Sequence, residues 1–284
     1  MSEAVTPPVW LITGCSSGFG RLLAERLHAR GDIVVATARS IQSLREIGRS
    51  DESRILRREL DVRQEVNVRR MVDRTLERYG RIDVLVNNAG YGYFGTQEEG
   101  ELEEIRAMYE TNVFGLISVT QAVLPSMRER RSGTVVNISS IGGRIATPRA
   151  GFYHSTKWAV EAISETLHLE THGFGIRVVV VEPGSFDTDF GPRSARRAKA
   201  DDDPNSPYAR LTPIWRERAA RHIFVPQQHP DEVVDGILEA VASDLPFVRL
   251  PIGRDATAIL AQRQEMGDAA FVEWMRQRLG EAGT

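Results

Sequence analysis

Short apolar runs alternate with helical patterns along this chain, and no other feature limits its fold as strongly. Seven runs have the length and composition of strands: residues 9–13, 33–37, 55–59, 84–87, 134–138, 177–182 and 247–250. Between them, apolar residues recur at helical spacing. Strands that alternate with helices form a parallel sheet with helices on both faces. The sequence therefore predicts an α/β fold with a doubly wound, seven-stranded, mostly parallel sheet.

A glycine-rich turn follows the first strand. Gly14, Gly18 and Gly20 come directly after residues 9–13, and a helical pattern starts at Leu22. Glycines let the backbone approach a ligand, and a helix N-terminus presents free N–H groups and a positive dipole end. This order of elements predicts a phosphate site. The spacing differs from the usual G-x-G-x-x-G fingerprint, and glycines that serve only a tight turn are the alternative.

The end of the second strand bears on the choice of cofactor. Sites for NAD usually carry an acid roughly 20 residues past the glycines, where it accepts the ribose hydroxyls. Here Ala38 and Arg39 hold that place, and Ser40 follows. An arginine pairs with a 2′-phosphate, whereas an acid repels it. The pattern favours NADP over NAD, with an ordinary exposed arginine as the alternative.

Tyr153 and Lys157 are four residues apart in a helical pattern. Positions i and i+4 lie on one face of a helix, so the lysine ammonium can stand beside the phenol. A nearby cation favours the phenolate, and we therefore expect a lowered tyrosine pKa and proton transfer at a carbonyl or alcohol oxygen. A surface tyrosine and a solvated lysine one turn apart are the alternative.

With these residues in view, the chain resembles the short-chain dehydrogenase/reductase family, in its single-domain branch, from Val9 to about Leu250. The glycine turn is similar to the family's TGxxxGxG motif. Further positions match in the correct order: Asp61 and Val62 at the adenine position, Asn88, Ala89 and Gly90 in the NNAG motif, Asn112, Ser140, and Pro183, Gly184 and Thr188 of the nicotinamide-side loop.

The resemblance implies a Rossmann-type fold and a set of site residues, and residues 1–284 are expected to form one domain. The implied catalytic residues are Asn112, Ser140, Tyr153 and Lys157. The implied NADP(H) contacts are Gly14, Ser16, Ser17, Gly18, Phe19, Gly20, Arg39, Ser40, Asp61, Val62, Asn88, Ala89, Gly90, Tyr153, Lys157, Pro183, Gly184 and Thr188.

The resemblance also implies how these residues act. Ser140 and Tyr153 donate hydrogen bonds to the substrate oxygen while hydride moves between nicotinamide and carbon. Lys157 lowers the pKa of Tyr153 and holds the nicotinamide ribose, and Asn112 steadies a water chain from Lys157. Ser140 is preferred to Ser139 because it lies thirteen positions before Tyr153, the family's spacing. His154 is expected to be a wall residue.

Two segments stand outside the regular alternation. Residues 185–228 carry several prolines amid mixed charge, which is typical of a lid or binding loop, and we expect a substrate lid. Residues 255–284 are expected to be a C-terminal helical addition, with one helix from Asp255 to Arg278. Aromatic residues near the motifs and on the lid favour a bulky apolar carbonyl or secondary alcohol as substrate, with core packing as the alternative. They are Tyr91, Tyr93, Phe94, Phe152, Phe186, Phe190, Trp215 and Phe224.

Several local motifs also resemble the hydroxysteroid and retinol dehydrogenase branch, although a steroid substrate does not follow. The family forms homodimers and homotetramers, so a homo-oligomer is expected. A net charge of −3 implies no general attraction to nucleic acid. The single cysteine, Cys15, allows no internal disulfide, and no cysteine–histidine cluster indicates a metal site. No apolar run approaches membrane-spanning length, so no membrane partner and a cytoplasmic location are expected.

Two other functions are compatible with parts of this pattern. A sugar-nucleotide epimerase or dehydratase of the extended branch is opposed by the glycine spacing and by the lack of a sizeable C-terminal substrate domain. A non-enzymatic NADP sensor or scaffold is opposed because such proteins commonly lose the tyrosine or the lysine, whereas Tyr153 and Lys157 are both present.

The cofactor preference is a first testable prediction. Charge-assisted hydrogen bonds are worth about 1.5–3 kcal/mol each, so Arg39 should favour NADPH over NADH by roughly tenfold or more in kcat/KM. The double change Ala38→Asp with Arg39→Ala should reverse the preference. Rising salt should weaken it in the unchanged protein, because the contact is partly exposed. Equal kcat/KM values for the two cofactors would show that Arg39 points away from the cofactor.

Overall fold

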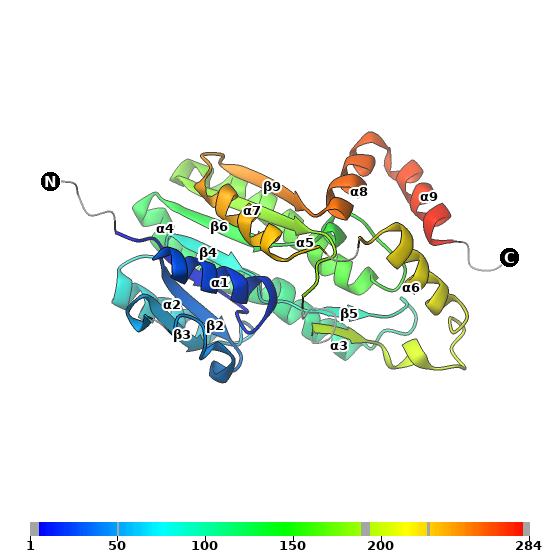
Figure 1. The fold of residues 1–284 in the computed structure, drawn as a ribbon, viewed down its shortest axis with the longest axis horizontal. Helices are drawn as coiled ribbons and strands as arrows, with labels where there is room; N and C mark the ends of the chain where they lie inside the picture. The colour runs from blue at the N-terminus through cyan, green and yellow to red at the C-terminus, as the bar shows by residue number, and fades with distance from the viewer. Residues whose placement is uncertain (1–5, 50, 189–193, 226–227, 281–284) are drawn as a thin grey trace.

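The computed structural model describes residues 6–49, 51–188, 194–225 and 228–280, and its centre is one parallel sheet (Figure 1). Seven strands lie in the order β3-β2-β1-β4-β6-β7-β9, and every neighbouring pair is parallel. The bounds are β1 Val9–Ile12, β2 Ile33–Ala38, β3 Ile55–Glu59, β4 Val84–Asn87, β6 Gly133–Ile138, β7 Ile176–Pro183 and β9 Phe247–Ile252. The predicted strands and the α/β Rossmann-type fold are confirmed.

Helices cover both faces of the sheet because successive strand residues point to opposite sides. On β1, Trp10 and Ile12 pack against α1 (Gly18–Arg30) and α7 (Asp231–Ala242). Val9 and Leu11 face the other layer, where the sheet packs against α2 Glu65–Tyr79, α4 Gly115–Arg130 and α5 Gly151–Thr171. Apolar side chains on both faces of the strands thus produce the three-layer arrangement.

The strand order reverses beside β1, and this reversal creates the crevice in which a site can form. The chain moves outward from β1 to β2 and β3, then returns to β4 on the other side of β1 and continues outward to β9. The segments that leave the carboxyl ends of β1 and β4 therefore diverge to opposite sides. Ligands of doubly wound sheets bind at such a switch point.

The remaining elements are smaller and lie around the carboxyl ends of the strands. A second, two-stranded parallel sheet pairs β5 (Gly92–Phe94) with β8 (Ala195–Arg197), and it was not predicted from the sequence. The other α-helices are α3 Leu102–Tyr109, α6 Leu211–His222, α8 Arg254–Glu265 and α9 Asp268–Leu279. Single turns of 3₁₀ helix span Ile41–Leu44, Glu52–Arg54, Ile141–Gly143, His172–Phe174 and Lys199–Asp202, and a π-helical turn spans Glu110–Phe114.

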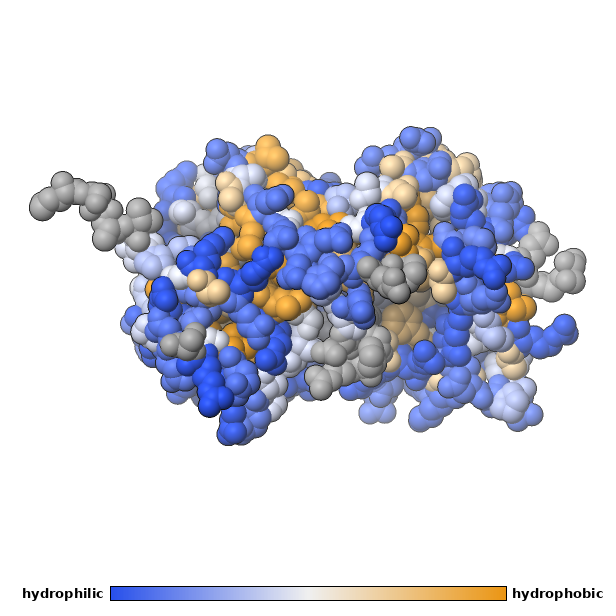
Figure 2. Space-filling view, in the orientation of Figure 1, coloured by the Kyte–Doolittle hydropathy of each residue, from blue (hydrophilic) through white to orange (hydrophobic). Residues whose placement is uncertain are grey.

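Two expectations about the C-terminal third were wrong in detail. The expected single helix from Asp255 to Arg278 is two helices, because Met266 and Gly267 adopt extended backbone angles between α8 and α9. The segment 185–228 was expected to be irregular, yet its described part contains β8 and the helix α6. In the space-filling view, hydrophobic side chains show between α7 and the C-terminal helices, whereas hydrophilic ones dominate the margins (Figure 2).

A chain of buried polar side chains joins the central strands to two helices on the same face. The Asn87 side-chain amide donates to Asn137 Oδ1 at 2.9 Å and to Thr120 Oγ1 at 2.9 Å. Asn137 Nδ2 donates in turn to Ser164 Oγ at 2.8 Å. These hydrogen-bonded side chains therefore connect β4 and β6 with α4 and α5. Buried polar groups of this kind are costly when a partner is lost.

Asn137→Ala should destabilise the protein by about 2 kcal/mol, because the Asn87 amide and the Ser164 hydroxyl each lose a buried partner. Urea unfolding at pH 7 measures this loss. Asn67 is exposed on α2, so Asn67→Ala is the matched control and should change the free energy of unfolding by less than about 0.5 kcal/mol. Unchanged stability in Asn137→Ala would contradict a structural role for the polar chain.

Candidate active site

A cavity of about 780 Å³ opens at the carboxyl ends of the strands, and it brings most of the predicted site residues together. Seventeen of them line it: Gly14, Ser16, Ser17, Gly18, Phe19, Arg39, Asp61, Val62, Asn88, Ala89, Gly90, Ser140, Tyr153, Lys157, Pro183, Gly184 and Thr188. Gly20, Ser40 and Asn112 are not among the lining residues.

The start of α1 forms one wall of the cavity and has the features of an anion site. Ser17 is the N-cap residue, but its side chain makes no capping hydrogen bond, and the first turn holds no acidic residue. Gly18 has a φ of +56°, and a Cβ there would meet nothing nearer than Thr188 Cβ at 4.0 Å. The first N–H groups of the helix are thus free of side-chain caps. A phosphate group fits this cradle.

Two other glycines of the turn provide close packing. A Cβ on Gly14 would lie 2.8 Å from Ala89 Cα, and a Cβ on Gly20 would collide with the side chain of Asn88. Asn88 Nδ2 donates to the carbonyl oxygens of Thr13 at 2.9 Å and Gly14 at 3.0 Å. The turn after β1 therefore rests directly on the turn after β4. Gly20, predicted as a cofactor contact, lies at this packing contact and not in the wall.

The far end of the cavity carries the predicted cofactor-selecting residues. Arg39 is exposed and follows β2. The Arg63 guanidinium, which donates to Asp61 Oδ2 at 2.6 Å, lowers the pKa of the Asp61 carboxyl, and the positive charge of Arg39 adds to this effect. Arg63 was not predicted as a site residue, although an arginine two residues after an aspartate is visible in the sequence. Ser40 is exposed beside Arg39.

Tyr153 and Ser140 meet in the middle of the cavity wall. Burial raises the pKa of the Tyr153 phenol to about 12, and a hydrogen bond with the Ser140 side chain opposes this rise. Ser140 precedes the 3₁₀ turn Ile141–Gly143, and its Oγ accepts the Gly142 N–H at 3.0 Å. The Ser140 hydrogen therefore remains available for donation towards the phenol. Ser139 also lines the cavity, but it is only 2% exposed.

Lys157 lies one turn further along α5 and is 7% exposed. Its Nζ donates to the carbonyl oxygen of Ile138 at 2.8 Å and stands 5.8 Å from the centre of the Tyr153 ring. Burial lowers the pKa of Lys157 to about 8, while the nearby Glu161 carboxylate opposes the change. The expectation that Lys157 lowers the Tyr153 pKa is not met in the protein alone. Burial shifts both groups towards their neutral forms, because each loses the solvation of its charge.

Asn112 is buried behind the cavity wall, in the π-helical turn between α3 and α4. Its Oδ1 accepts the Tyr91 N–H at 3.0 Å, and its Nδ2 donates to the Tyr91 carbonyl at 2.8 Å and to Thr156 Oγ1 at 3.0 Å. A Cβ on Gly90 would lie 3.1 Å from Asn112 Oδ1 and 3.8 Å from Lys157 Nζ. Asn112 thus connects the turn after β4 to α5. Its predicted role with a water chain stays a prediction.

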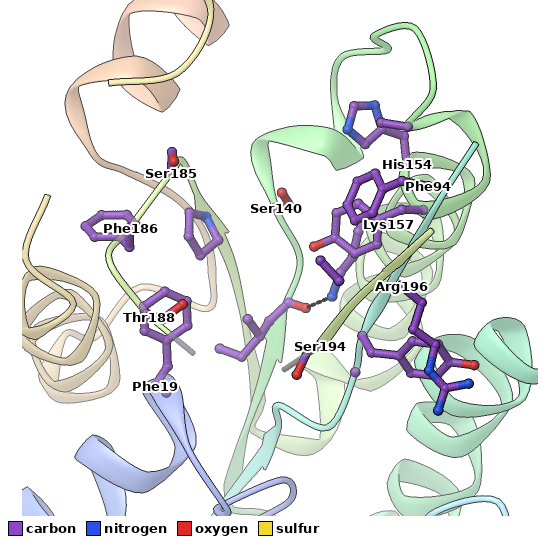
Figure 3. Close-up of a pocket in the computed structure, with 18 of the residues that line it drawn as sticks. Phe19, Phe94, Ser140, His154, Lys157, Ser185, Phe186, Thr188, Ser194 and Arg196 are labelled. Carbon is purple, nitrogen blue, oxygen red and sulfur yellow. Dashed lines mark hydrogen bonds between the residues drawn. The ribbon is translucent and has the colours of Figure 1, made fainter. Parts of the chain in front are cut away.

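The loop after β7 faces the catalytic residues from the other side of the cavity. Figure 3 shows Ser185, Phe186 and Thr188 on one side, Lys157 on the other, and Ser140 between them. Phe186 also packs edge-to-face on Phe19, with ring centres 5.8 Å apart. The nicotinamide-side loop and the glycine turn therefore form one continuous wall.

The predicted aromatic residues divide between the cavity and the core. Five of them line the cavity: Tyr91, Phe94, Phe186, Trp215 and Phe224. The prediction was wrong for Tyr93 and Phe152, which do not line it. Instead, Tyr93 is 1% exposed and stacks on Phe152 at 6.1 Å, because alternate residues of β5 face opposite sides. Phe190 lies outside the described residues.

An ion cluster in the wall was not predicted from the sequence. Arg149 has a φ of +67° and donates from its Nε to Asp201 at 2.9 Å. Arg216 of α6 pairs with the same carboxylate, which is 1% exposed. Both arginines line the cavity. The cluster joins the loop before α5 to the segment 185–228, and no local sequence pattern pairs residues this far apart.

The comparisons with known proteins agree with this geometry. The family model described as short chain dehydrogenase matches residues 8–199. An oxidoreductase of Botryotinia fuckeliana is 32% identical over 96% of this chain and 99% of its own length. The chain belongs to the short-chain dehydrogenase/reductase family.

The protein is also similar to solved structures along nearly its whole length. A short-chain dehydrogenase from Streptomyces avermitilis is 37% identical, with a TM-score of 0.85, over 96% of this chain and 98% of that one. A 3-ketodihydrosphingosine reductase of Bacteroides thetaiotaomicron is 45% identical over 65% of this chain and 66% of its own length.

Two further solved structures differ in cofactor. A gluconate 5-dehydrogenase from Burkholderia cenocepacia, in complex with NADP and tartrate, is 26% identical with a TM-score of 0.72 over 88% of this chain and 95% of that one. A 3-ketoacyl-(acyl-carrier-protein) reductase from Brucella melitensis, complexed with NADH, is 25% identical with a TM-score of 0.73 over 87% of this chain and 97% of that one.

Two other kinds of feature are absent from the part of the chain that the structure describes. No helix there has both the length and the apolar character needed to cross a membrane. Within the same residues, no group of three or more histidine, cysteine, aspartate or glutamate side chains is placed to hold a metal ion.

The buried His154 should make the stability of the protein depend on pH. Burial lowers its pKa to about 4, against an ordinary 6.5. As the pH falls from 6.5 to 4, the unfolded chain takes up a proton that the folded protein does not bind, so stability is lost. The loss reaches about 3 kcal/mol below pH 4, at 1.36 kcal/mol per pH unit.

The comparison of wild type with His154→Gln between pH 7 and pH 4 tests this prediction. Urea unfolding should show a smaller loss of stability in the variant, because the glutamine does not titrate. Glu161 has an opposite shift, since burial raises its pKa to about 7, but it is present in both proteins. His222→Gln changes an exposed histidine and should keep the wild-type slope. Equal slopes for wild type and His154→Gln would contradict the prediction.

Proposed function

We propose that this protein is an NADP(H)-dependent oxidoreductase acting on a bulky apolar carbonyl or secondary alcohol. One observation carries the proposal. Ser140, Tyr153 and Lys157 converge in a single cavity with the uncapped start of α1 and with Arg39. This arrangement combines two hydroxyl donors, a buried amine and an anion cradle, which together serve carbonyl reduction or alcohol oxidation.

The residues divide the chemistry among themselves. Bound NADP(H) supplies or accepts the hydride, and the protein orients and polarises the reactants. Ser140 and Tyr153 donate hydrogen bonds to the substrate oxygen, where negative charge develops. A phenol with a pKa near 12 keeps its proton at neutral pH, so Tyr153 is ready to act as the acid in carbonyl reduction. Lys157 would hold the sugar of the cofactor and would supply positive charge near the phenol.

The preference for NADP rests on the adenine end of the cavity. Arg39 lines the wall, and Ala38 stands where an acid would bind the ribose hydroxyls of NAD. A 2′-phosphate would receive charge-assisted hydrogen bonds from Arg39. The structural relative in complex with NADP supports this preference, whereas the relative complexed with NADH shows that the fold accepts both.

The substrate class rests on the other end of the cavity. Aromatic surface is presented there by Phe94, Trp215 and Phe224. The ring centres of Phe94 and Tyr153 are 5.6 Å apart. Two carboxylates already face the two neighbouring cations: Asp201 pairs with Arg149 and Arg216, and Asp202 lies 3.4 Å from Arg216, so this cluster does not require an anionic substrate. The bacterial relative named 3-ketodihydrosphingosine reductase supports a ketone as substrate. We further propose that the segment 185–228 is the substrate lid, because Phe186, Trp215 and Phe224 belong to it.

Several expectations stay predictions. They are a homodimer or homotetramer, no nucleic-acid or membrane partner, and a cytoplasmic location. It also stays a prediction that residues 1–284 form a single domain with a C-terminal addition.

Tyr153→Phe tests the proposed chemistry directly. The change removes the hydroxyl donor and keeps the ring, so turnover should fall by about 10²-fold or more. NADPH should bind within a few-fold of wild type, measured by the fluorescence of the bound nicotinamide. The substrate for the turnover assay comes from a panel of carbonyls reduced with NADPH. Tyr79→Phe deletes a hydroxyl at the far end of α2 and should leave turnover unchanged. Near-normal turnover of Tyr153→Phe would refute the mechanism.

A further inference from the structure

Asp255 stands in the first turn of α8, in the C-terminal addition, and is 2% exposed. Both of its carboxylate oxygens accept hydrogen bonds. Oδ2 accepts from the backbone N–H of Ser185 at 2.8 Å and of Val225 at 3.3 Å. Oδ1 accepts from Gln228 Nε2 at 2.8 Å and from the backbone N–H of Ala256 at 2.9 Å. The carboxylate therefore satisfies four donors in a buried position.

Three of these donors come from the two ends of the segment 185–228. Ser185 begins the segment, while Val225 and Gln228 lie at its end. The two ends also contact each other directly: Gln228 Nε2 donates to the Ser185 carbonyl at 2.7 Å, and the Asp187 N–H donates to the Gln228 carbonyl at 3.1 Å. The Arg254 N–H donates to Gln228 Oε1. Asp255 and Gln228 thus form a neck at which the segment leaves and rejoins the rest of the molecule.

The neck lies directly against the loop that carries the nicotinamide-side residues. A Cβ on Gly184 would collide with Asp255 Oδ1, so the carboxylate occupies the space that a side chain at this position would take. The Gly184 N–H donates to the Ile252 carbonyl at 2.9 Å. Gly184, Ser185 and Thr188 all line the cavity. The position of the cavity wall therefore depends on the position of the carboxylate.

The rest of the C-terminal addition packs behind the same wall. Residues of α8 and α9 form one apolar cluster with the end of α6 and with the turn that follows Ser140. Its buried members are Ile141, Ile145, Ile223, Ala256, Ile259, Leu260, Phe271, Met275 and Leu279. Arg263 of α8 also lies over the Trp158 ring of α5 at 5.4 Å. The addition thus contacts the elements that carry Ser140, Lys157 and the lid, and Asp255 is its polar contact with the neck.

We propose that Asp255 is a positioning residue, which closes the neck of the segment 185–228 and holds the loop 183–188 in the shape that receives the nicotinamide end of NADP(H). The choice of ligand rests on the proposed function; the closed neck does not. A carboxylate is required because it accepts on both oxygens. An asparagine would turn its NH₂ group towards one of the two donor pairs whichever way its amide faced. Through Asp255, the C-terminal addition therefore helps to shape the cofactor site.

Asp255→Asn tests the proposal with two readouts. The first is amide hydrogen exchange of the protein alone, where peptides covering residues 184–188 and 222–225 should exchange at least tenfold faster than in wild type. The second is NADPH binding, followed by nicotinamide fluorescence, where Kd should rise at least tenfold. The KM for NADPH should rise with it, whereas kcat at saturating NADPH should stay within about threefold of wild type, because Asp255 touches no reacting atom.

Two matched variants separate positioning from a general loss of stability. Asp268→Asn makes the same chemical change in the first turn of α9, where the carboxylate is 91% exposed and pairs with Arg263, and it should change neither readout. Val123→Ala opens a small cavity under the sheet in α4, away from the neck. It should lower Tm without raising the Kd for NADPH or the exchange of the two neck peptides.

Three outcomes would decide against the proposal. Wild-type exchange in both neck peptides of Asp255→Asn would show that the carboxylate does not hold the neck. Faster exchange with an unchanged Kd would show that the neck does not position the cofactor loop. A rise in Kd that Val123→Ala reproduces at equal loss of Tm would assign the effect to stability. If wild-type protein itself failed to bind NADPH, the proposed function would be refuted. Amide hydrogen exchange in Asp255→Asn would still test whether the carboxylate holds the neck.

Discussion

The contact between the turn after β1 and the turn after β4 is the interaction on which the site depends. Thr13 Oγ1 accepts the N–H groups of Asn88 and Ala89, both at 3.0 Å, and the Asn88 amide returns hydrogen bonds to the first turn. This contact is possible only because Gly14 and Gly20 carry no side chain. It closes the floor of the crevice at the point where the strand order reverses. The start of α1 on one side, and Gly90 beside Asn112 and Lys157 on the other, take their positions from it.

Burial governs the electrostatics of the catalytic centre more strongly than the spacing of charges does. The four-residue interval between Tyr153 and Lys157 places the two groups on one face of α5, as a helix requires. Their surroundings then act on each group separately, because desolvation raises the pKa of the phenol and lowers the pKa of the amine. The Ile138 carbonyl and the Glu161 carboxylate support the charged lysine, and Ser140 supports the ionised tyrosine. The protein alone thus sets a protonated phenol next to a weakly basic amine.

The C-terminal third of the chain completes the cavity. The segment 185–228 supplies aromatic wall residues, and its strand β8 pairs with β5 in the cavity wall. The ion cluster of Arg149, Asp201 and Arg216 and the hydrogen bonds of Asp255 anchor this segment at two separate places. Both carboxylates are buried, so removing one partner from either group should lower the stability of the protein. Such anchoring keeps a long insertion in a defined place over the site.

The sequence by itself determined the seven-stranded sheet, the glycine turn, the uncharged Ala38 beside Arg39, and the spacing of Ser140, Tyr153 and Lys157. These features could be predicted because each depends on local periodicity, on backbone freedom or on a fixed interval within one element. Only the tertiary structure decided that Asn112 and Gly20 lie behind the wall, that Tyr93 and Phe152 belong to the core, and that Asp255 reaches Ser185. Those outcomes depend on which distant segments meet and on how deeply they are buried, and a carboxylate 70 positions from its donor leaves no local pattern.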